Sequence, residues 1–168
     1  DNLLDSSRLQ SGNTSLNMQI LRIDALLNDV ISHARVHYPD LKINLDVRQE
    51  LPALQGDPRR LKQVFDNLVS NVVRYAPESP LNFRIFKEPD GISIDVKDFG
   101  PGIPSGDLER IFERFYRSEA HAGDTRGSGL GLFICKKIIE AHDGQITVSS
   151  FQGRGTTFHV HLPFNHKM

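Results

Sequence analysis

The sequence predicts a two-layer α/β (α+β) sandwich, in which a mixed sheet of about five strands packs under three helices and a long loop serves as a lid. Three observations predict this fold. Five or six short strands alternate with three amphipathic helices, and hairpins are mixed among the helix crossings. The third observation is size, because 168 residues form one domain that can bury roughly two-thirds of its unfolded surface without a disulfide or a metal.

The first fifteen residues are set apart from the rest. Residues 1–12 have the apolar spacing and the terminal glycine of a helix end, and a polar joint follows them. We therefore interpret residues 1–15 as the end of a longer helical element. The domain proper is expected over residues 16–163, and residues 164–168 are expected to form a frayed tail.

The remaining elements follow from periodicity and capping. Alternating apolar residues predict strands over 18–23, 42–47, 81–86, 92–96, 146–149 and 156–162. Helical spacing predicts helices over 24–38, 57–74 and 129–142. Asp24 and Asp57 are the expected N-caps of the first two, and Pro58 suits a first helical turn. Residues 98–128 form a long loop, with a helical turn or two expected over 108–116, and such loops usually carry function.

Composition excludes several classes of protein. The 20 basic and 21 acidic residues give a net charge of −1, so no basic excess points to nucleic acid. The single cysteine, Cys135, excludes an internal disulfide and fits a reducing compartment, where it is expected to pack in the core. No apolar run approaches the length of a membrane span, and no signal peptide opens the chain. We expect a cytoplasmic domain, with any membrane anchor of a parent protein in segments outside this chain.

Three polar residues share one face of the 57–74 helix. Asn67, Asn71 and Arg74 are spaced i, i+4 and i+7, beside the apolar stripe. An asparagine carbonyl is a hard oxygen ligand suited to Mg²⁺, and an arginine fork suits phosphate oxygens. The alternative is a solvated helix face. Because asparagine is a poor interior helix residue, two of them one turn apart favour function.

The segment 98–104 follows a predicted strand directly. A carboxylate at a strand end can accept a hydrogen bond from the exocyclic amine of adenine, and glycines let the backbone approach the ring. The alternative is a plain turn that ends the strand. Asp98-Phe99-Gly100 also matches a motif of eukaryotic-type protein kinases, but no His-Arg-Asp loop and no Val-Ala-Ile-Lys strand accompany it, so that family is rejected.

The segment 126–132 opens the last predicted helix and is rich in glycine. Free amides at a helix N-terminus form an anion site that phosphate can approach closely. The spacing is neither that of a Rossmann fingerprint nor that of a P-loop. A flexible hinge before the helix is the alternative.

In this order and spacing, the motifs resemble the ATP-binding catalytic domain of sensor histidine kinases, from about Leu16 to Pro163. The four boxes of that family match residues 67–75 (N box), 98–104 (G1 box), 111–117 (F box) and 127–132 (G2 box), with a glycine-threonine segment at 153–158. Residues 1–9 are similar to the end of the second helix of the family's dimerisation hairpin.

The resemblance implies which residues hold ATP and Mg²⁺. Asn71 would be the metal ligand and Asn67 a second metal or phosphate contact, whereas Arg74 stands where the family usually has lysine. Asp98 would bind the adenine amine, and Phe112 and Phe115 would pin the lid. The implied catalytic residues are Asn67, Arg117 and Arg126. The implied nucleotide-binding residues are Asn67, Asn71, Arg74, Tyr75, Asp98, Gly100, Gly102, Ile103, Gly127, Ser128, Gly129, Leu130, Gly131, Leu132 and Thr156.

The resemblance also implies transfer of the γ-phosphoryl group to a histidine on a separate dimerisation domain, with a response regulator receiver domain as partner. Related gyrase-type ATPases place a glutamate base where this chain has Asn67, and an amide cannot take a proton from water. The chain is expected to be a monomer and its parent a homodimer. A serine kinase or slow ATPase of the same fold, and a degenerate nucleotide-binding or docking module, stay open as alternatives.

The acceptor histidine is expected outside this chain. Only His142 precedes an acidic residue, and it is interpreted as a helix-terminal histidine stabilised by the helix dipole. His159 and His161 share one strand face and are expected to face solvent.

Overall fold

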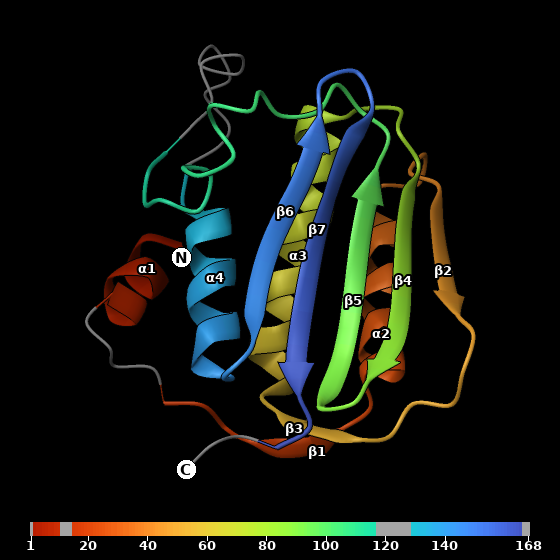
Figure 1. Cartoon of the computed structure of the whole chain (residues 1–168), viewed down its shortest axis with the longest axis vertical. Helices are drawn as coiled ribbons and strands as arrows, with labels where there is room; N and C mark the ends of the chain where they lie inside the picture. The colour runs from red at the N-terminus through yellow and green to blue at the C-terminus, as the bar shows by residue number, and fades with distance from the viewer. Residues whose placement is uncertain (1, 11–14, 117–128, 166–168) are drawn as a thin grey trace.

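The computed structural model describes residues 2–10, 15–116 and 129–165, and its centre is a five-stranded mixed sheet (Figure 1). The strand order is β2-β4-β5-β7-β6, and only the β2–β4 pair is parallel. The sheet strands are β2 (Ile43–Val47), β4 (Leu81–Glu88), β5 (Gly91–Asp98), β6 (Gln145–Phe151) and β7 (Gly155–Pro163). The expected mixed sheet of about five strands is confirmed.

Helices cover one face of this sheet. They are α2 (Ile23–His37), α3 (Pro58–Tyr75) and α4 (Gly131–Ala141); in Figure 1, α2 and α3 lie behind the strands and α4 stands beside β6. A further short helix, α1 (Asn2–Gln10), lies against the outer side of α4. The apolar faces of the helices and of the inward strand residues form one core, in which Phe65 of α3 stands edge-to-face with Phe83 of β4.

A second, two-stranded sheet lies at the lower end in Figure 1. It pairs β1 (Gln19–Leu21) with β3 (Leu54–Gly56) antiparallel. The sequence predicts β1 but not β3, because the residues around Leu54–Gly56 show no alternation of apolar and polar side chains. Leu54 is nevertheless buried, and the pairing fixes the chain entering the domain against the start of α3.

The start of α3 agrees with its predicted cap, whereas the start of α2 does not. Asp57 Oδ1 accepts hydrogen bonds from the backbone N–H groups of Arg59 and Arg60, at 3.1 and 3.2 Å. The expected cap at Asp24 is wrong, because the N-cap position is Arg22 and no side chain caps that helix. Asp24 lies in the first turn instead, where a negative charge suits the helix dipole.

His142 ends α4 as its C-cap residue, as the sequence predicts, and its side chain is buried. Its Nε2 lies 3.0 Å from the backbone nitrogen of Asp57, and its Nδ1 lies 2.8 Å from the carbonyl oxygen of Ile138. A backbone N–H can only donate and a carbonyl can only accept, so the ring proton is on Nδ1. The residue therefore joins the end of α4 to the start of α3.

His159 and His161 lie on the outer face of the sheet, as predicted, but each has fixed partners. His159 contacts Asp95 at 2.7 Å and Ser149 at 2.9 Å. His161 contacts Ser93 at 3.0 Å and Asp90 at 3.2 Å. Both side chains are only partly exposed, and they brace neighbouring strands.

The expected helical turns over residues 108–116 are a series of tight turns without a helix. Backbone bonds of 2.9 Å run from Asp107 to Pro104, from Arg110 to Asp107 and from Glu113 to Arg110, always three residues back. Phe112 packs edge-to-face on Phe158 of β7, with ring centroids 6.2 Å apart.

Candidate functional site

The predicted site residues that the structure describes lie at one end of the molecule. The C-terminal half of α3, the end of β5, the β6–β7 turn and the start of α4 meet at the upper end in Figure 1. These elements carry the residues of three of the four sequence boxes. Arg117, Arg126, Gly127 and Ser128 lie outside the described residues, so their predicted roles stay predictions.

Asp98 ends β5 and is only 8% exposed. Its Oδ1 accepts a hydrogen bond of 2.9 Å from the backbone N–H of Gly100. Burial raises the pKa of the Asp98 carboxyl above its usual value, and hydrogen bonds from the backbone of Gly100 and Thr156 oppose that rise. The carboxylate is therefore held in one place, at the edge of the core, by a strand and the turn that follows it.

Two glycines of the 98–104 segment have no room for a side chain. A Cβ at Gly100 would lie 2.3 Å from the Cβ of Ala76, at the end of α3. Gly102 has φ +79°, and a Cβ there would lie 2.3 Å from the carbonyl oxygen of Phe151. Because only glycine fits such close contacts and such a φ, the segment is pressed against both α3 and the β6–β7 turn.

Hydroxyl groups from outside the motif hold this segment. Ser150 Oγ accepts the backbone N–H of Ile103 at 2.7 Å and also contacts Thr156 Oγ1 at 2.8 Å. Ser79 Oγ accepts the backbone N–H of Phe99 at 2.8 Å. The predicted residues Ile103 and Thr156 are thus brought together with Asp98. Ser79 and Ser150 were missed, since nothing in the sequence near them signals these contacts.

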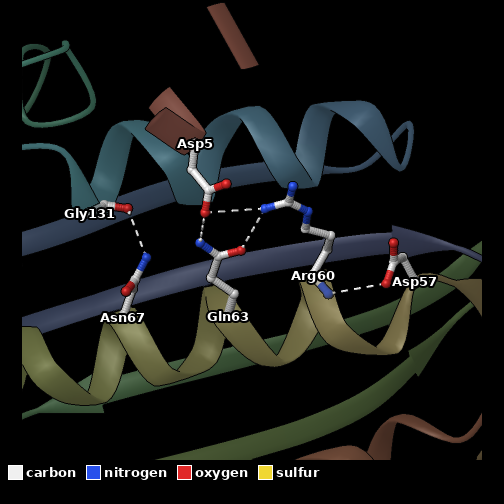
Figure 2. A network of polar contacts seen from close by, with 6 residues as sticks. All are labelled: Asp5, Asp57, Arg60, Gln63, Asn67 and Gly131. Atoms are coloured by element: carbon white, nitrogen blue, oxygen red, sulfur yellow. Dashed lines mark hydrogen bonds and ion pairs between the residues drawn. The ribbon is translucent and has the colours of Figure 1, made fainter. Parts of the chain in front are cut away.

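The polar stripe of α3 is half-buried, as a stripe at the rim of the core should be. Asn67, Asn71, Arg74 and Tyr75 all belong to this last part of the helix. Asn67 Nδ2 donates to the carbonyl oxygen of Gly131 at 3.4 Å, which joins the stripe to the first turn of α4 (Figure 2). The guanidinium of Arg74 lies 5.7 Å from the ring centre of Tyr75.

The described part of the glycine-rich segment starts at Gly129, which has φ +74°. Its carbonyl accepts the backbone N–H of Phe115 at 2.9 Å, and a Cβ on Gly129 would lie within 2.9 Å of the Phe115 backbone. Leu130 is buried at the N-cap of α4. Gly131 and Leu132 open the helix, and a Cβ on Gly131 would meet nothing within 4 Å. Open space therefore lies at Gly131, next to Asn67, whereas Gly129 and Leu130 are packed.

Cys135 packs in the core, as predicted. It is fully buried on α4 and lies 3.5 Å from the carbonyl oxygen of Val64 on α3. Burial raises the pKa of the thiol to about 12.

The chain is similar to solved structures of histidine kinases. The full-length ShkA, crystallised in complex with AMPPNP, matches with a TM-score of 0.85 and 28% identity, over 99% of this chain and 35% of that one. The Acinetobacter baumannii histidine kinase AdeS matches with a TM-score of 0.77 and 25% identity, over 97% of this chain and 75% of that one.

Curated sequences agree with the structures. The sensor protein kinase WalK of Staphylococcus aureus is 32% identical over 167 residues, which cover 97% of this chain and 40% of the relative. Strain variants of WalK match equally well, and the chain covers 28% of their length. The chain therefore spans well under half of these curated relatives. Among the described residues, no helix is long and apolar enough to cross a membrane.

A family model covers most of the domain. The model described as histidine kinase-, DNA gyrase B- and HSP90-like ATPase matches residues 56–166, which include α3, the sheet strands from β4 onwards and α4. The sequence motifs, the two-layer fold and the relatives all point the same way. The chain belongs to this ATPase family, as an ATP-binding domain of the histidine kinase type.

Proposed function

We propose that the chain binds ATP together with Mg²⁺ and, as part of a longer parent, donates the γ-phosphoryl group to a histidine on a dimerisation domain. A response regulator receiver domain would then take the phosphoryl group. The position of Asp98 carries the proposal. Its buried carboxylate is held by backbone hydrogen bonds from Gly100 and Thr156, and an ionised carboxylate has about four lone-pair sites, so it keeps capacity to accept the adenine 6-amino group.

The residues on α3 fit a Mg²⁺ ion that is bound jointly by the protein and by the phosphates of a nucleotide. The described residues contain no group of three or more histidine, cysteine or acidic side chains that could hold a metal by itself. Mg²⁺ usually keeps several waters and takes one or two protein oxygens plus phosphate oxygens. The half-buried amide of Asn71 would supply one such oxygen, and Arg74, one turn further along the helix, would contact phosphate. When bound, the ion would neutralise phosphate charge.

Transfer is favoured over hydrolysis by the chemistry of Asn67. An amide cannot act as general base for a water molecule at neutral pH. The Asn67 nitrogen also donates to Gly131, so the side chain links α3 with the first turn of α4 (Figure 2). We infer that this site holds ATP in position for an acceptor, and that a slow ATPase or a serine kinase is the less supported activity.

Calorimetric titration with ADP, with and without Mg²⁺, tests the proposal. We expect Mg²⁺ to strengthen ADP binding to the wild-type chain. Asn71→Ala should remove that gain, a loss of about tenfold or roughly 1.4 kcal/mol, with little effect on binding in the absence of metal. Asn28→Ala is the matched control, because Asn28 is an exposed asparagine on α2, remote from the described site.

Three outcomes would contradict the proposal. Binding that is equal with and without Mg²⁺ would favour a degenerate module that holds nucleotide or docks a partner. Absence of any ADP binding by the wild-type chain would show that the proposed nucleotide site is wrong. Phosphate release at the rate of true ATPases would favour the hydrolytic alternative.

A further inference from the structure

Two groups of side chains on the domain hold the short helix α1. At its first turn, Asp5 Oδ2 accepts from Gln63 Nε2 at 3.0 Å and lies 3.4 Å from Arg60 Nη1 (Figure 2). Arg60 also donates to Gln63 Oε1 at 3.0 Å. Burial tends to raise the pKa of Asp5, but the bond from Gln63 and the charge of Arg60 outweigh it and lower the pKa below its usual value.

The second group is a single arginine from the loop. Arg114 Nε donates to Ser6 Oγ at 2.8 Å, and its Nη1 donates to Gln10 Oε1 at 2.7 Å. Ser6 is completely buried and Leu9 is 5% exposed, so the helix is packed as well as bonded. A nine-residue helix is unstable alone in water, and α1 therefore depends on this surface for its structure.

The next residue along the loop connects this contact to the glycine-rich segment. Phe115 follows Arg114 directly, and its backbone N–H donates to the Gly129 carbonyl at 2.9 Å. Phe115 has φ +65°, a conformation that a bulky residue adopts only when its surroundings hold it there. The holding contacts are α1 on one side, through Arg114, and Gly129 on the other.

We propose that Arg114 is a positioning residue: its bonds to Ser6 and Gln10 of α1 fix Phe115 and, through it, the Gly129 backbone beside the nucleotide. This inference rests on the proposed nucleotide-binding function. Docked α1 orders the Gly129 backbone before the ligand arrives, so the nucleotide has less chain to order and binds more tightly. By linkage, bound nucleotide stabilises the docked helix by the same factor.

Variants at both ends of the Arg114–Ser6 contact test the proposal on the full chain. Arg114→Met keeps the aliphatic stem and removes the donors, and Ser6→Ala removes the acceptor on α1. We expect each to weaken Mg·ADP binding by about three- to tenfold. The double variant should bind no more weakly than Arg114→Met alone, because both changes break one path. Ser6 belongs to α1, so a loss on Ser6→Ala cannot come from a missing phosphate contact of Arg114.

Arg110→Met is the matched control. Arg110 lies on the same loop and is exposed, and it pairs with Glu113 of its own segment at 3.4 Å. It should leave Mg·ADP affinity unchanged. Hydrogen exchange gives an independent readout: Mg·ADP should slow exchange of the α1 amides in the wild type and not in Arg114→Met.

Each result has a distinct meaning. If the wild-type chain binds no Mg·ADP, the proposed function fails. If it binds and Arg114→Met weakens binding no more than Arg110→Met, the positioning role is wrong while the proposed function stands. Unchanged α1 exchange on addition of Mg·ADP to the wild type would also overturn the positioning role.

Discussion

The residue at which stability and function oppose each other most clearly is Asp98. Its burial raises the pKa of the carboxyl, and the backbone groups of Gly100 and Thr156 offset only part of that rise. A carboxyl whose pKa is raised on folding favours the folded state when protonated, and this contribution is lost as the pH rises through the folded pKa. The ionised Asp98 therefore destabilises the domain at neutral pH.

Asp98→Asn should weaken nucleotide binding and stabilise the fold. The amide oxygen can still accept from Gly100, but its NH₂ group opposes the adenine amine, so we expect ADP affinity to fall by at least about tenfold. Thermal unfolding should show a higher Tm than the wild type near pH 7. The gain should shrink as the pH falls through the raised pKa of the wild-type carboxyl, because protonation removes the cost of the buried charge.

Asp46→Asn is the control for this pair of measurements. Asp46 is a partly exposed carboxylate on β2, paired with Arg48 at 3.1 Å. Surface ion pairs of this kind contribute little to the free energy of folding, so Tm should stay near the wild-type value. ADP affinity should also be unchanged. The assigned role of Asp98 would be contradicted if Asp98→Asn were less stable than the wild type at neutral pH and bound ADP with wild-type affinity.

Single residues of the site were predictable where local chemistry marks them. A carboxylate between a strand and two glycines, and asparagines inside a helix, stand out from their neighbours in the sequence. Ser150 contacts Ile103 from 47 residues away, and Arg114 contacts Ser6 from 108 residues away. Nothing near Ser150 or Arg114 in the sequence marks these contacts, because folding alone brings the partners together.

At the scale of elements, the start of α3 is the junction of the domain. Asp57 caps the helix and also accepts the backbone N–H of Asn17, at 3.0 Å, from the segment that leads into β1. Its own N–H donates to the buried ring of His142, at the end of α4. One residue thus joins the incoming chain and two helices.

Asp57→Ala should destabilise the domain more than the loss of an ordinary cap. Removing a cap costs about 1 kcal/mol, and here the Asn17 N–H loses its partner as well, so we expect about 2 kcal/mol in denaturant unfolding. Asp57→Asn should recover most of the loss, because asparagine caps equally well. An alanine variant within about 0.5 kcal/mol of wild type would show that the junction is not needed.

Helices and strands were predictable where the periodic pattern of apolar residues extends over many residues. The eighteen residues of α3 show an uninterrupted apolar stripe after an aspartate and a proline, and both its ends were predicted. Strand β3 has no periodic pattern around it, and its partner β1 lies far away in the sequence. The start of α2 was misplaced because Arg22 caps without a side-chain bond, a feature with no sequence signal.

At the scale of the whole molecule, the reactivity of the Cys135 thiol measures how often the core unfolds. The thiol is fully buried between α4 and α3, and burial raises its pKa to about 12. We expect a thiol reagent such as DTNB to react with the denatured chain at the rate of a free thiol and to react far more slowly with the folded chain. Equal rates in both states would mean that α3 and α4 separate without unfolding.

The chain alone should not phosphorylate itself. Among its histidines, only His142 is followed by an acidic residue, and that ring is 2% exposed with both nitrogens engaged. Incubation with Mg²⁺ and γ-labelled ATP should leave the chain without label, while ADP titration of the same sample shows an intact site. Acid-labile label on the chain would contradict the assignment of the acceptor to another domain.

The small β1–β3 sheet has a practical consequence. The backbone N–H of Gln55 in β3 donates to the carbonyl of Phe164, just after β7, so the chain enters and leaves the domain at the same pole (Figure 1). The end of β5, whose last residue is Asp98, points to the opposite pole. A biosensor chip coupled through a tag after the last residue would therefore hold the protein with its ligand end outward, and immobilisation would leave access for small molecules in the flowing buffer.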